Sequence, residues 1–254
     1  MTVLHEIVGR TAVVTLSRPE RRNAVDATTA AELAAAFERF DADPECDVAI
    51  LTGAKGTFCA GADLQAIAAG EERRIDSEEH APMGPTRMQL SKPVIAAVEG
   101  YAVGGGFELA LWCDIRVAAS NATFGFLNRR FGVPLVDMGT IRLPRLIGHG
   151  RAMDLILTGR PVTAGEAERF GIVDRLAPPG GALDVALDLA RQLSAFPQEA
   201  LRNDRLSAIE QWSLERDAAI ANELARGRAT MAAIDVEQAA ARFAAGLGRR
   251  GEPL

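Results

Sequence analysis

The stretch from Pro93 to Asp114 constrains this chain most, because it joins a short apolar run to an apolar helix through three consecutive glycines. The run Val94 to Val98 is typical of a buried strand. Gly104 to Gly106 then lead into Phe107 to Trp112, a helical segment whose only charge is Glu108. Glycines at a helix N-terminus leave backbone N–H groups open to a ligand, and the helix dipole favours negative charge there. The junction therefore predicts a site that stabilises an oxygen atom as it becomes negative.

A second turn of small residues follows an earlier strand. Asp47 to Thr52 is an apolar run, and the chain continues after a short loop into TFCAGADL, Thr57 to Leu64. The small side chains from Ala60 to Ala62 leave backbone amides uncovered, while Asp63 is placed to cap the helix that follows. Two such turns can each offer one N–H group to the same oxygen atom.

Composition limits the class of protein. With 254 residues, 48% of them hydrophobic and 24% charged, the chain is long enough for a large core and is typical of a globular protein. A net charge of -6 argues against nucleic acid as the main partner. The three cysteines lack C-x-x-C spacing and the three histidines lack metal-ligand spacing, so neither a disulfide framework nor a metal site is predicted. No signal peptide or transmembrane run is recognised, which predicts a cytoplasmic protein that does not enter a membrane.

Local patterns predict several elements on either side of the glycine junction. Val3 to Val8 and Thr11 to Leu16 are predicted to form the two strands of a hairpin that turns at Gly9. Capping boxes are predicted at Thr29 with Glu32 and at Thr163 with Glu166. These patterns describe scaffold and do not by themselves suggest chemistry.

Two longer stretches differ from the rest in character. Gln65 to Ser91 is charged and irregular, and it is interpreted either as a wall or lid over a site or as a surface loop without function. After Pro178 the pattern becomes helical and rich in alanine, so we predict a core of residues 1–180 and a helical region of residues 181–254 for packing or trimerisation. The predicted C-terminal helices are Ala182–Leu193, Gln198–Gln211, Leu214–Thr230 and Val236–Leu247.

Four segments together resemble the crotonase (enoyl-CoA hydratase/isomerase) superfamily. They are, in chain order, RPERRNAVD, TFCAGADL, KPVIAAVEGYAVGGGFELALWCD and LTGRPVTAGEAERFGIVDRL. The resemblance implies an α/β (α+β) fold of the crotonase/ClpP type, in which strand-strand-helix repeats form a spiral with two nearly perpendicular sheets and a helical C-terminal region. It also implies assembly as a homotrimer or a dimer of trimers. The glycines fit neither a dinucleotide fingerprint nor a P-loop.

The resemblance implies an acyl-CoA thioester as the substrate. No separate cofactor is expected, because coenzyme A is part of that substrate. By the same resemblance the thioester oxygen is held in an oxyanion hole by the N–H groups of Ala62 and Gly105. The coenzyme is expected near Arg21, Arg22, Ala24, Ala60, Asp63 and Leu64. A solvated surface loop is the alternative interpretation of the arginines.

The candidate acid–base residues decide the reaction. Glu108 lies three residues after Gly105, shares its helix face and leans toward the helix N-terminus. A lone carboxylate on an apolar helix is costly, which favours a catalytic role, and Glu108 matches the first catalytic glutamate of the hydratases. The position of the second is occupied by Asn128, whose amide cannot transfer a proton at neutral pH. Asp137, in a segment that resembles the dienoyl-CoA isomerases, is the candidate second carboxylate; a loop residue or helix cap is its alternative.

These features favour an enzyme of the enoyl-CoA hydratase type that stabilises an enolate. One alternative is an enoyl- or dienoyl-CoA double-bond isomerase that uses Glu108 and Asp137. An alternative from another class is an acyl-CoA-binding protein with little catalysis, in which Asn128 marks a lost site. Asp26, Asp63 and Asp114 are interpreted as caps or turn residues.

Overall fold

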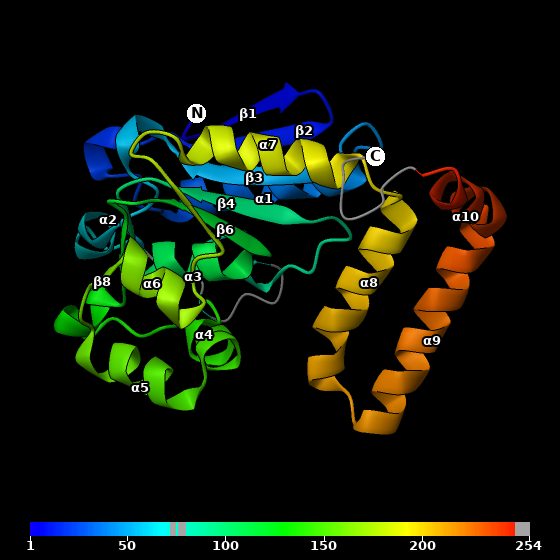
Figure 1. The fold of residues 1–254 in the computed structure, drawn as a ribbon. Coiled ribbons are helices and arrows are strands. Elements are labelled where there is room, and N and C mark those ends of the chain that lie inside the picture. The colour runs from blue at the N-terminus through cyan, green and yellow to red at the C-terminus, as the bar shows by residue number, and fades with distance from the viewer. Residues whose placement is uncertain (72–74, 76–79, 247–254) are drawn as a thin grey trace.

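The larger of two β-sheets forms the centre of the protein (Figure 1). The computed structural model describes residues 1–71, 75 and 80–246. The first two strands pair antiparallel and each later strand lies parallel to its neighbour. Central strands of a parallel sheet are buried on both faces, which explains why their sequences are apolar runs without alternation. In spatial order the strands are β1 (Val3–Val8), β2 (Thr11–Leu16), β3 (Val48–Gly53), β4 (Val94–Val98), β6 (Ile115–Ala119) and β9 (Arg175–Ala177).

A smaller sheet lies beside the larger one and starts at the end of β4. The chain leaves β4, passes Gly100 and enters the small sheet immediately, before it turns into α3. This change of sheet places the three glycines directly after a strand of the small sheet, at the start of α3. The small sheet consists of β5 (Tyr101–Val103), β7 (Thr123–Gly125) and β8 (Val162–Thr163).

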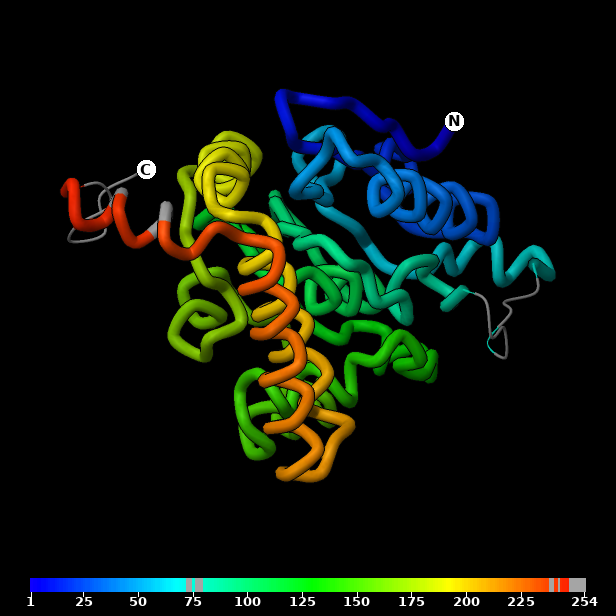
Figure 2. Tube along the Cα trace, turned by 90° about the vertical axis from the view of Figure 1, so that its right-hand side faces the viewer, coloured from blue at the N-terminus to red at the C-terminus, as the bar shows by residue number. Residues whose placement is uncertain are grey.

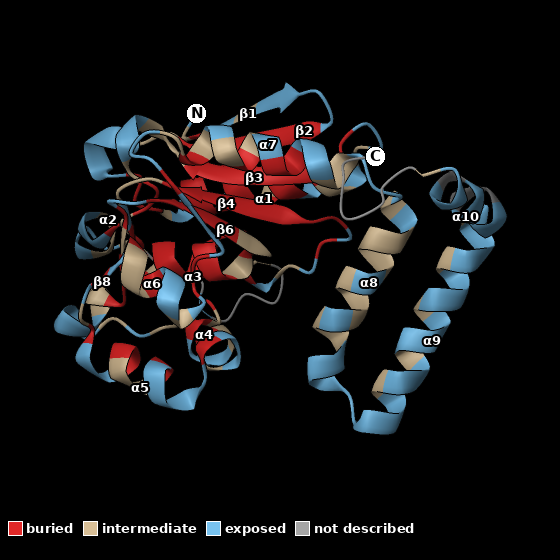
Figure 3. Cartoon of the chain, viewed as in Figure 1, coloured by how far each residue is buried: buried red, intermediate tan, exposed pale blue. Residues whose placement is uncertain are grey.

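Helices cover the sheets and extend beyond them. The buried residues are concentrated in the central strands and α3, whereas α9 is largely exposed (Figure 3). The side view shows α8 and α9 running side by side as a hairpin (Figure 2). The helices are α1 (Ala27–Ala42), α2 (Leu64–Ala68), α3 (Gly105–Trp112), α4 (Gly139–Ile147), α5 (His149–Thr158), α6 (Ala164–Phe170), α7 (Ala182–Ser194), α8 (Gln198–Glu210), α9 (Arg216–Ala233) and α10 (Val236–Ala244).

The predicted boundary after residue 180 stays a prediction. The helix that follows it, α7, packs on the larger sheet through Ala182, Ala186 and Leu189, which share a buried apolar cluster with residues of β3 and β4. The hairpin of α8 and α9 projects from this body (Figure 1). No helix in the described ranges is both long and apolar enough to cross a membrane.

The two predicted capping boxes are only partly correct. The N-cap of α1 is Asp26, whose Oδ1 accepts from the Thr29 N–H at 2.8 Å, so the box at Thr29 is wrong. The Glu32 carboxylate instead accepts from the N–H of Thr2 at 2.7 Å. Thr163 caps α6 as predicted, but the Glu166 carboxylate pairs with Arg160 at 2.7 Å and does not close the box. In both cases another partner competes for the glutamate, 30 residues away for Glu32 and six residues away for Glu166.

The predicted irregular stretch is structured over the part that the structure describes. Residues 81–86 are all buried, and Pro85–Arg87 form one turn of 3₁₀ helix (η3). A surface loop is therefore the wrong interpretation for residues 81–86, whereas the interpretation as a wall over a site stays a prediction. Residues 72–74 and 76–79, on which the expectation of a lid also rested, lie outside the described residues.

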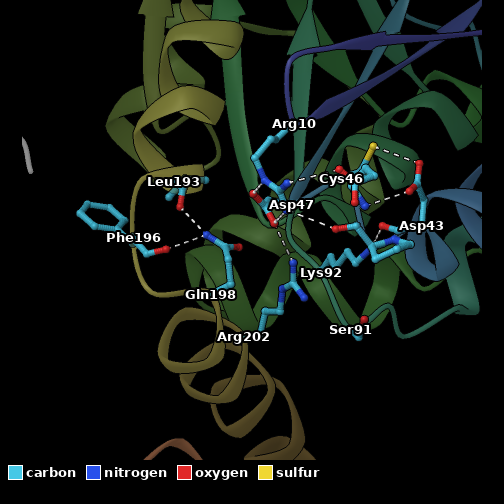
Figure 4. A network of polar contacts seen from close by, with 12 residues as sticks. Arg10, Asp43, Cys46, Asp47, Ser91, Lys92, Leu193, Phe196, Gln198 and Arg202 are labelled. Carbon is cyan, nitrogen blue, oxygen red and sulfur yellow. Dashed lines mark hydrogen bonds and ion pairs between the residues drawn. The ribbon is translucent and has the colours of Figure 1, made fainter. Parts of the chain in front are cut away.

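A buried carboxylate links α8 to the sheet (Figure 4). Asp47, whose side chain is 2% exposed, precedes β3 and accepts from Arg202 of α8 at 3.0 Å. Arg10, at the start of β2, donates to the same carboxylate through Nη2 at 2.9 Å. Lys92 lies nearby and donates from Nζ to the Phe40 carbonyl at 3.0 Å. The base of the helical hairpin is thus joined to the sheet by charge-assisted hydrogen bonds.

We expect Asp47→Ala to lower the free energy of unfolding by about 3 kcal/mol, because it removes the partner of two arginines at a largely buried site. Urea denaturation followed by tryptophan fluorescence measures the change. Asp188→Ala is the control, since Asp188 pairs with Arg191 on the exposed surface of α7, and we expect no measurable loss for it. Equal losses for the two variants would contradict this account of Asp47.

Candidate active site

The two turns of small residues lie against each other. The Cys59 N–H donates to the Tyr101 carbonyl at 2.8 Å, and the Val103 N–H donates to the Cys59 carbonyl at 3.0 Å. This pairing brings Gly61 onto the start of α3. A Cβ on Gly61 would lie 2.9 Å from the Gly105 nitrogen, and a Cβ on Gly106 would lie 2.2 Å from the Cys59 carbonyl oxygen. Side chains at these glycines would force the turns apart.

A cavity of about 220 Å³ opens where the turns meet. Ala62 and Gly105 both line it, and neither N–H has an acceptor within the part of the chain that the structure describes. Gly105 is the first residue of α3, so its N–H is one of the unpaired donors of a helix start. The lining residues are Arg22, Ala60, Ala62, Leu64, Val103, Gly104, Gly105, Glu108, Leu127, Asn128, Phe131, Val133, Pro134 and Asp137.

Glu108 is the buried carboxylate of this cavity, at 2% exposure. Its Oε1 accepts two backbone hydrogen bonds, from Asp137 N–H at 3.0 Å and from Gly139 N–H at 2.8 Å. Burial and the nearby Asp137 charge raise the pKa of Glu108 to about 7, against the two hydrogen bonds and the Arg142 charge, which lower it. A carboxyl group with such a pKa can both give and take a proton near neutral pH.

Asp137 lies in the same cavity and is also 2% exposed. Its Oδ1 accepts from the Met83 N–H at 2.9 Å and from the Thr86 hydroxyl at 2.6 Å. The second oxygens, Asp137 Oδ2 and Glu108 Oε2, have no partner among the described residues, yet they are not sealed from solvent. These two oxygens therefore face the cavity. The structure brings together the two carboxylates that the sequence proposed as a pair.

The Asn128 side chain lines the cavity, and its neutral amide is held in one orientation. Its Nδ2 donates to the Val133 carbonyl at 2.8 Å, which fixes the orientation of the amide. Its Oδ1 then lies beside Gly104, buried and without a hydrogen-bond partner in the described chain. This side chain supplies no transferable proton at the position where the resemblance expected a carboxylate.

Only some of the residues proposed to bind coenzyme A line the cavity. Arg22, Ala60 and Leu64 line the cavity beside Ala62. Asp63 is buried, caps α2 and pairs with Arg18 at 3.1 Å, so its carboxylate is already engaged within the protein. Ala24 is buried and Arg21 is exposed, and neither lines the cavity. Their contact with coenzyme A remains a prediction.

Two of the three aspartates interpreted as caps or turn residues are helix N-caps. Asp26 caps α1 and Asp63 caps α2. Asp114 accepts from the Val94 N–H at 2.8 Å and pairs with Arg205 of α8 at 2.9 Å. The partner on α8 could not be read from local sequence.

Three residues around the carboxylates were not found from sequence. Met83 and Thr86 donate to Asp137, and Arg142 donates to the Thr86 carbonyl at 2.7 Å and to the Asp137 carbonyl at 3.3 Å. No motif or periodicity marks them. The one available signal was Asp137 itself, since a buried carboxylate requires donors.

Fold and site together define a member of the crotonase superfamily, and three comparisons agree. The family model described as Enoyl-CoA hydratase/isomerase matches residues 6–246. Enoyl-CoA hydratase EchA19 of Mycobacterium tuberculosis is 41% identical over 194 residues, which cover 74% of this chain and 72% of the relative. Carnitinyl-CoA dehydratase of Salmonella arizonae is 44% identical over 182 residues, 71% of this chain and 69% of the relative.

A solved structure, that of enoyl-CoA hydratase EchA1 from Mycobacterium marinum, superposes with a TM-score of 0.90. It is 39% identical, and the match covers 96% of this chain and 95% of that one. The chain belongs to the enoyl-CoA hydratase/isomerase family. The predicted superfamily, fold class and enzyme class are thereby confirmed.

We expect Glu108→Gln to stabilise the protein at pH 8 and to leave its stability unchanged at pH 4. The folded protein raises the pKa of Glu108 from 4.5 to about 7, so it binds this proton more tightly than the unfolded chain does. Stability is therefore lost as pH rises from about 4.5 to 7. A neutral glutamine avoids this loss, which amounts to at most about 3 kcal/mol. Urea denaturation at the two pH values measures it, and a variant that is less stable at pH 8 would contradict the assignment.

Proposed function

We propose that this protein is an enoyl-CoA hydratase-type enzyme, which adds water across the double bond of a 2-enoyl-CoA thioester. The observation that carries the proposal is the juxtaposition of Glu108 with the two unpaired N–H groups in one cavity. Family membership implies the acyl-CoA substrate. The names of the relatives, which include hydratases and dehydratases of CoA thioesters, support the same class of reaction.

The oxyanion hole is proposed from the Ala62 and Gly105 N–H groups. The thioester oxygen would accept both hydrogen bonds, which strengthen as the oxygen gains charge in the enolate. Preorganised donors of this kind matter for rate, since the loss of one typically costs about 10²–10³ in turnover. The glycines that allow the two turns to touch are therefore part of the proposed catalytic geometry.

Two carboxyl groups supply the proton transfers. As the oxygen of water bonds to C3 of the acyl chain, one carboxylate takes a proton from that water, and the other carboxyl group gives a proton to C2. The net change to the substrate is the addition of one water. One carboxyl group is left with one proton more and the other with one proton fewer, and proton exchange with solvent restores both. We assign these roles to Glu108 and Asp137, because both have an oxygen facing the cavity.

Double-bond isomerisation is the second candidate, and Asn128 favours it. Migration of a double bond needs a proton removed from one carbon and returned to another, with no water to activate. The same pair, Glu108 and Asp137, could perform that transfer. A neutral amide where the resemblance expects the second hydratase glutamate is compatible with such a reaction.

The assembly proposed from the resemblance, a homotrimer or a dimer of trimers, is supported by the exposed apolar residues of α9. Ile220, Leu224 and Met231 are 43%, 55% and 66% exposed. A helix with such side chains is commonly covered by a partner. Light scattering of the purified chain is expected to give three or six times its 27.0 kDa mass, and a monomer would contradict the proposal. Cytoplasmic residence and a reaction without a separate cofactor remain predictions.

Incubation with a short 2-enoyl-CoA in ¹⁸O-labelled water is expected to give labelled 3-hydroxyacyl-CoA, measured by mass spectrometry. Glu108→Gln should lower kcat about 10²–10⁴-fold and retain substrate binding. The control is Glu168→Gln, since Glu168 is exposed on α6, and it should keep full activity.

The other outcomes separate the alternatives. Unlabelled product from double-bond migration, with a 3-enoyl- or dienoyl-CoA as the substrate, would favour the isomerase. Tight binding with neither product would favour an acyl-CoA-binding protein. Full activity of Glu108→Gln would overturn the catalytic role of Glu108.

A further inference from the structure

The carboxylate of Asp137 is oriented by residues far away in sequence. Its Oδ1 accepts from the Thr86 hydroxyl at 2.6 Å and from the Met83 N–H at 2.9 Å. Thr86 is completely buried in η3. Two donors on one oxygen hold the carboxylate in a single orientation and leave Oδ2 toward the cavity.

The same short segment contacts three parts of the active site. The Met83 side chain fills the space beside Gly105, where a Cβ would lie 2.5 Å from Sδ. The Thr86 carbonyl accepts from Arg142 of α4 at 2.7 Å. Residues 83–86 therefore join the start of α3, which offers the Gly105 N–H, to the turn that carries Asp137.

We propose that Thr86 is a positioning residue for the reaction, whose hydroxyl fixes Asp137 Oδ1 so that Oδ2 is presented to the substrate. The inference rests on the proposed function, because it assumes that Asp137 transfers a proton. Without the hydroxyl, one of the two donors to a buried carboxylate is lost. The carboxylate would then turn more freely, and Oδ2 would no longer be held in one direction.

Charged groups approach Asp137 from three elements. Glu108 lies on α3, and the Asp137 N–H donates to it. Arg142 lies on α4 and donates to the Asp137 carbonyl at 3.3 Å. Arg87 follows Thr86 in η3 and donates to the Val136 carbonyl at 3.0 Å. Substitution of Thr86 changes none of these charges, so a loss of kcat in Thr86→Val would report the loss of its hydroxyl.

Thr86→Val keeps the shape of the side chain and removes the hydroxyl, and Thr86→Ser keeps the hydroxyl. We expect Thr86→Val to lower kcat about 10-fold, with KM changed less than about threefold, because the hydrogen bond to a charged group is lost. Thr86→Ser should restore most of the rate.

A double-mutant cycle separates positioning from a purely structural role. In an Asp137→Asn background, Thr86→Val should cause little further loss of kcat, because the two residues act as one unit. Independent losses that multiply, an unchanged kcat for Thr86→Val, or a Thr86→Ser variant as impaired as Thr86→Val would each overturn the inference. Should the valine variant fail to fold in a thermal melt, Thr86→Ala takes its place with the same expected results.

The wild-type protein tests the proposed function separately. Absence of turnover in the wild type would contradict the proposed function itself. Normal wild-type turnover with Thr86 variants of unchanged kcat would contradict the inference alone.

Discussion

The burial of one carboxylate, Glu108, is the constraint on which the active site depends. A charged group at this depth is strongly disfavoured unless donors compensate for the lost water. The protein supplies two backbone N–H groups to Oε1, from Asp137 and Gly139. Burial and the second carboxylate act in the opposite direction, and the balance leaves the pKa at about 7. A weaker balance in either direction would leave Glu108 permanently neutral or permanently charged, and neither state can both give and take a proton.

The backbone turn that makes this balance possible has an unfavourable conformation. Met138 lies between the two donors and has a φ of 70°, in the left-handed region, which costs roughly 1–2 kcal/mol for a residue with a side chain. The turn allows both N–H groups to reach one oxygen, as in other backbone anion sites. Gly139 is required for a different reason, since a Cβ there would lie 2.8 Å from Glu108 Oε1. The two hydrogen bonds that offset the burial of the charge thus require a strained residue and a position without a side chain.

The sequence predicted those features that depend on near neighbours. The hairpin strands and β4 have the predicted bounds, because apolar patterning and turns are local. Glu108 could be found because one charge on an apolar helix is itself a local signal. At α1, however, Asp26 and Thr29 both suit an N-cap, and the choice depends on Glu32, which binds Thr2 across 30 residues of chain. A capping motif is recognised from a few neighbouring residues, so it cannot reveal a competing partner that lies so far away in the chain.

The remaining site residues were beyond prediction for the same reason. Thr86 and Met83 reach Asp137 across 51 and 54 residues, and only the folding of residues 83–86 onto the turn that carries Asp137 brings them together. The sequence proposed Asp137 as a partner of Glu108, but it contained no sign of the donors that orient it. A hydroxyl in a charged, irregular stretch is typical of a surface loop, and burial alone changes that interpretation.

The arrangement of donors also limits which chemistry the cavity can perform. The Ala62 and Gly105 N–H groups stabilise an enolate whether water adds or a double bond migrates, so they do not distinguish the two reactions. Asn128 is locked by Val133 and moves no proton. The groups that can transfer protons are then Glu108 and Asp137, each of which has a free oxygen that faces the same cavity. The reaction is decided by the acyl carbon that lies beside each free oxygen, and the orientation of Asp137 determines where one of them points.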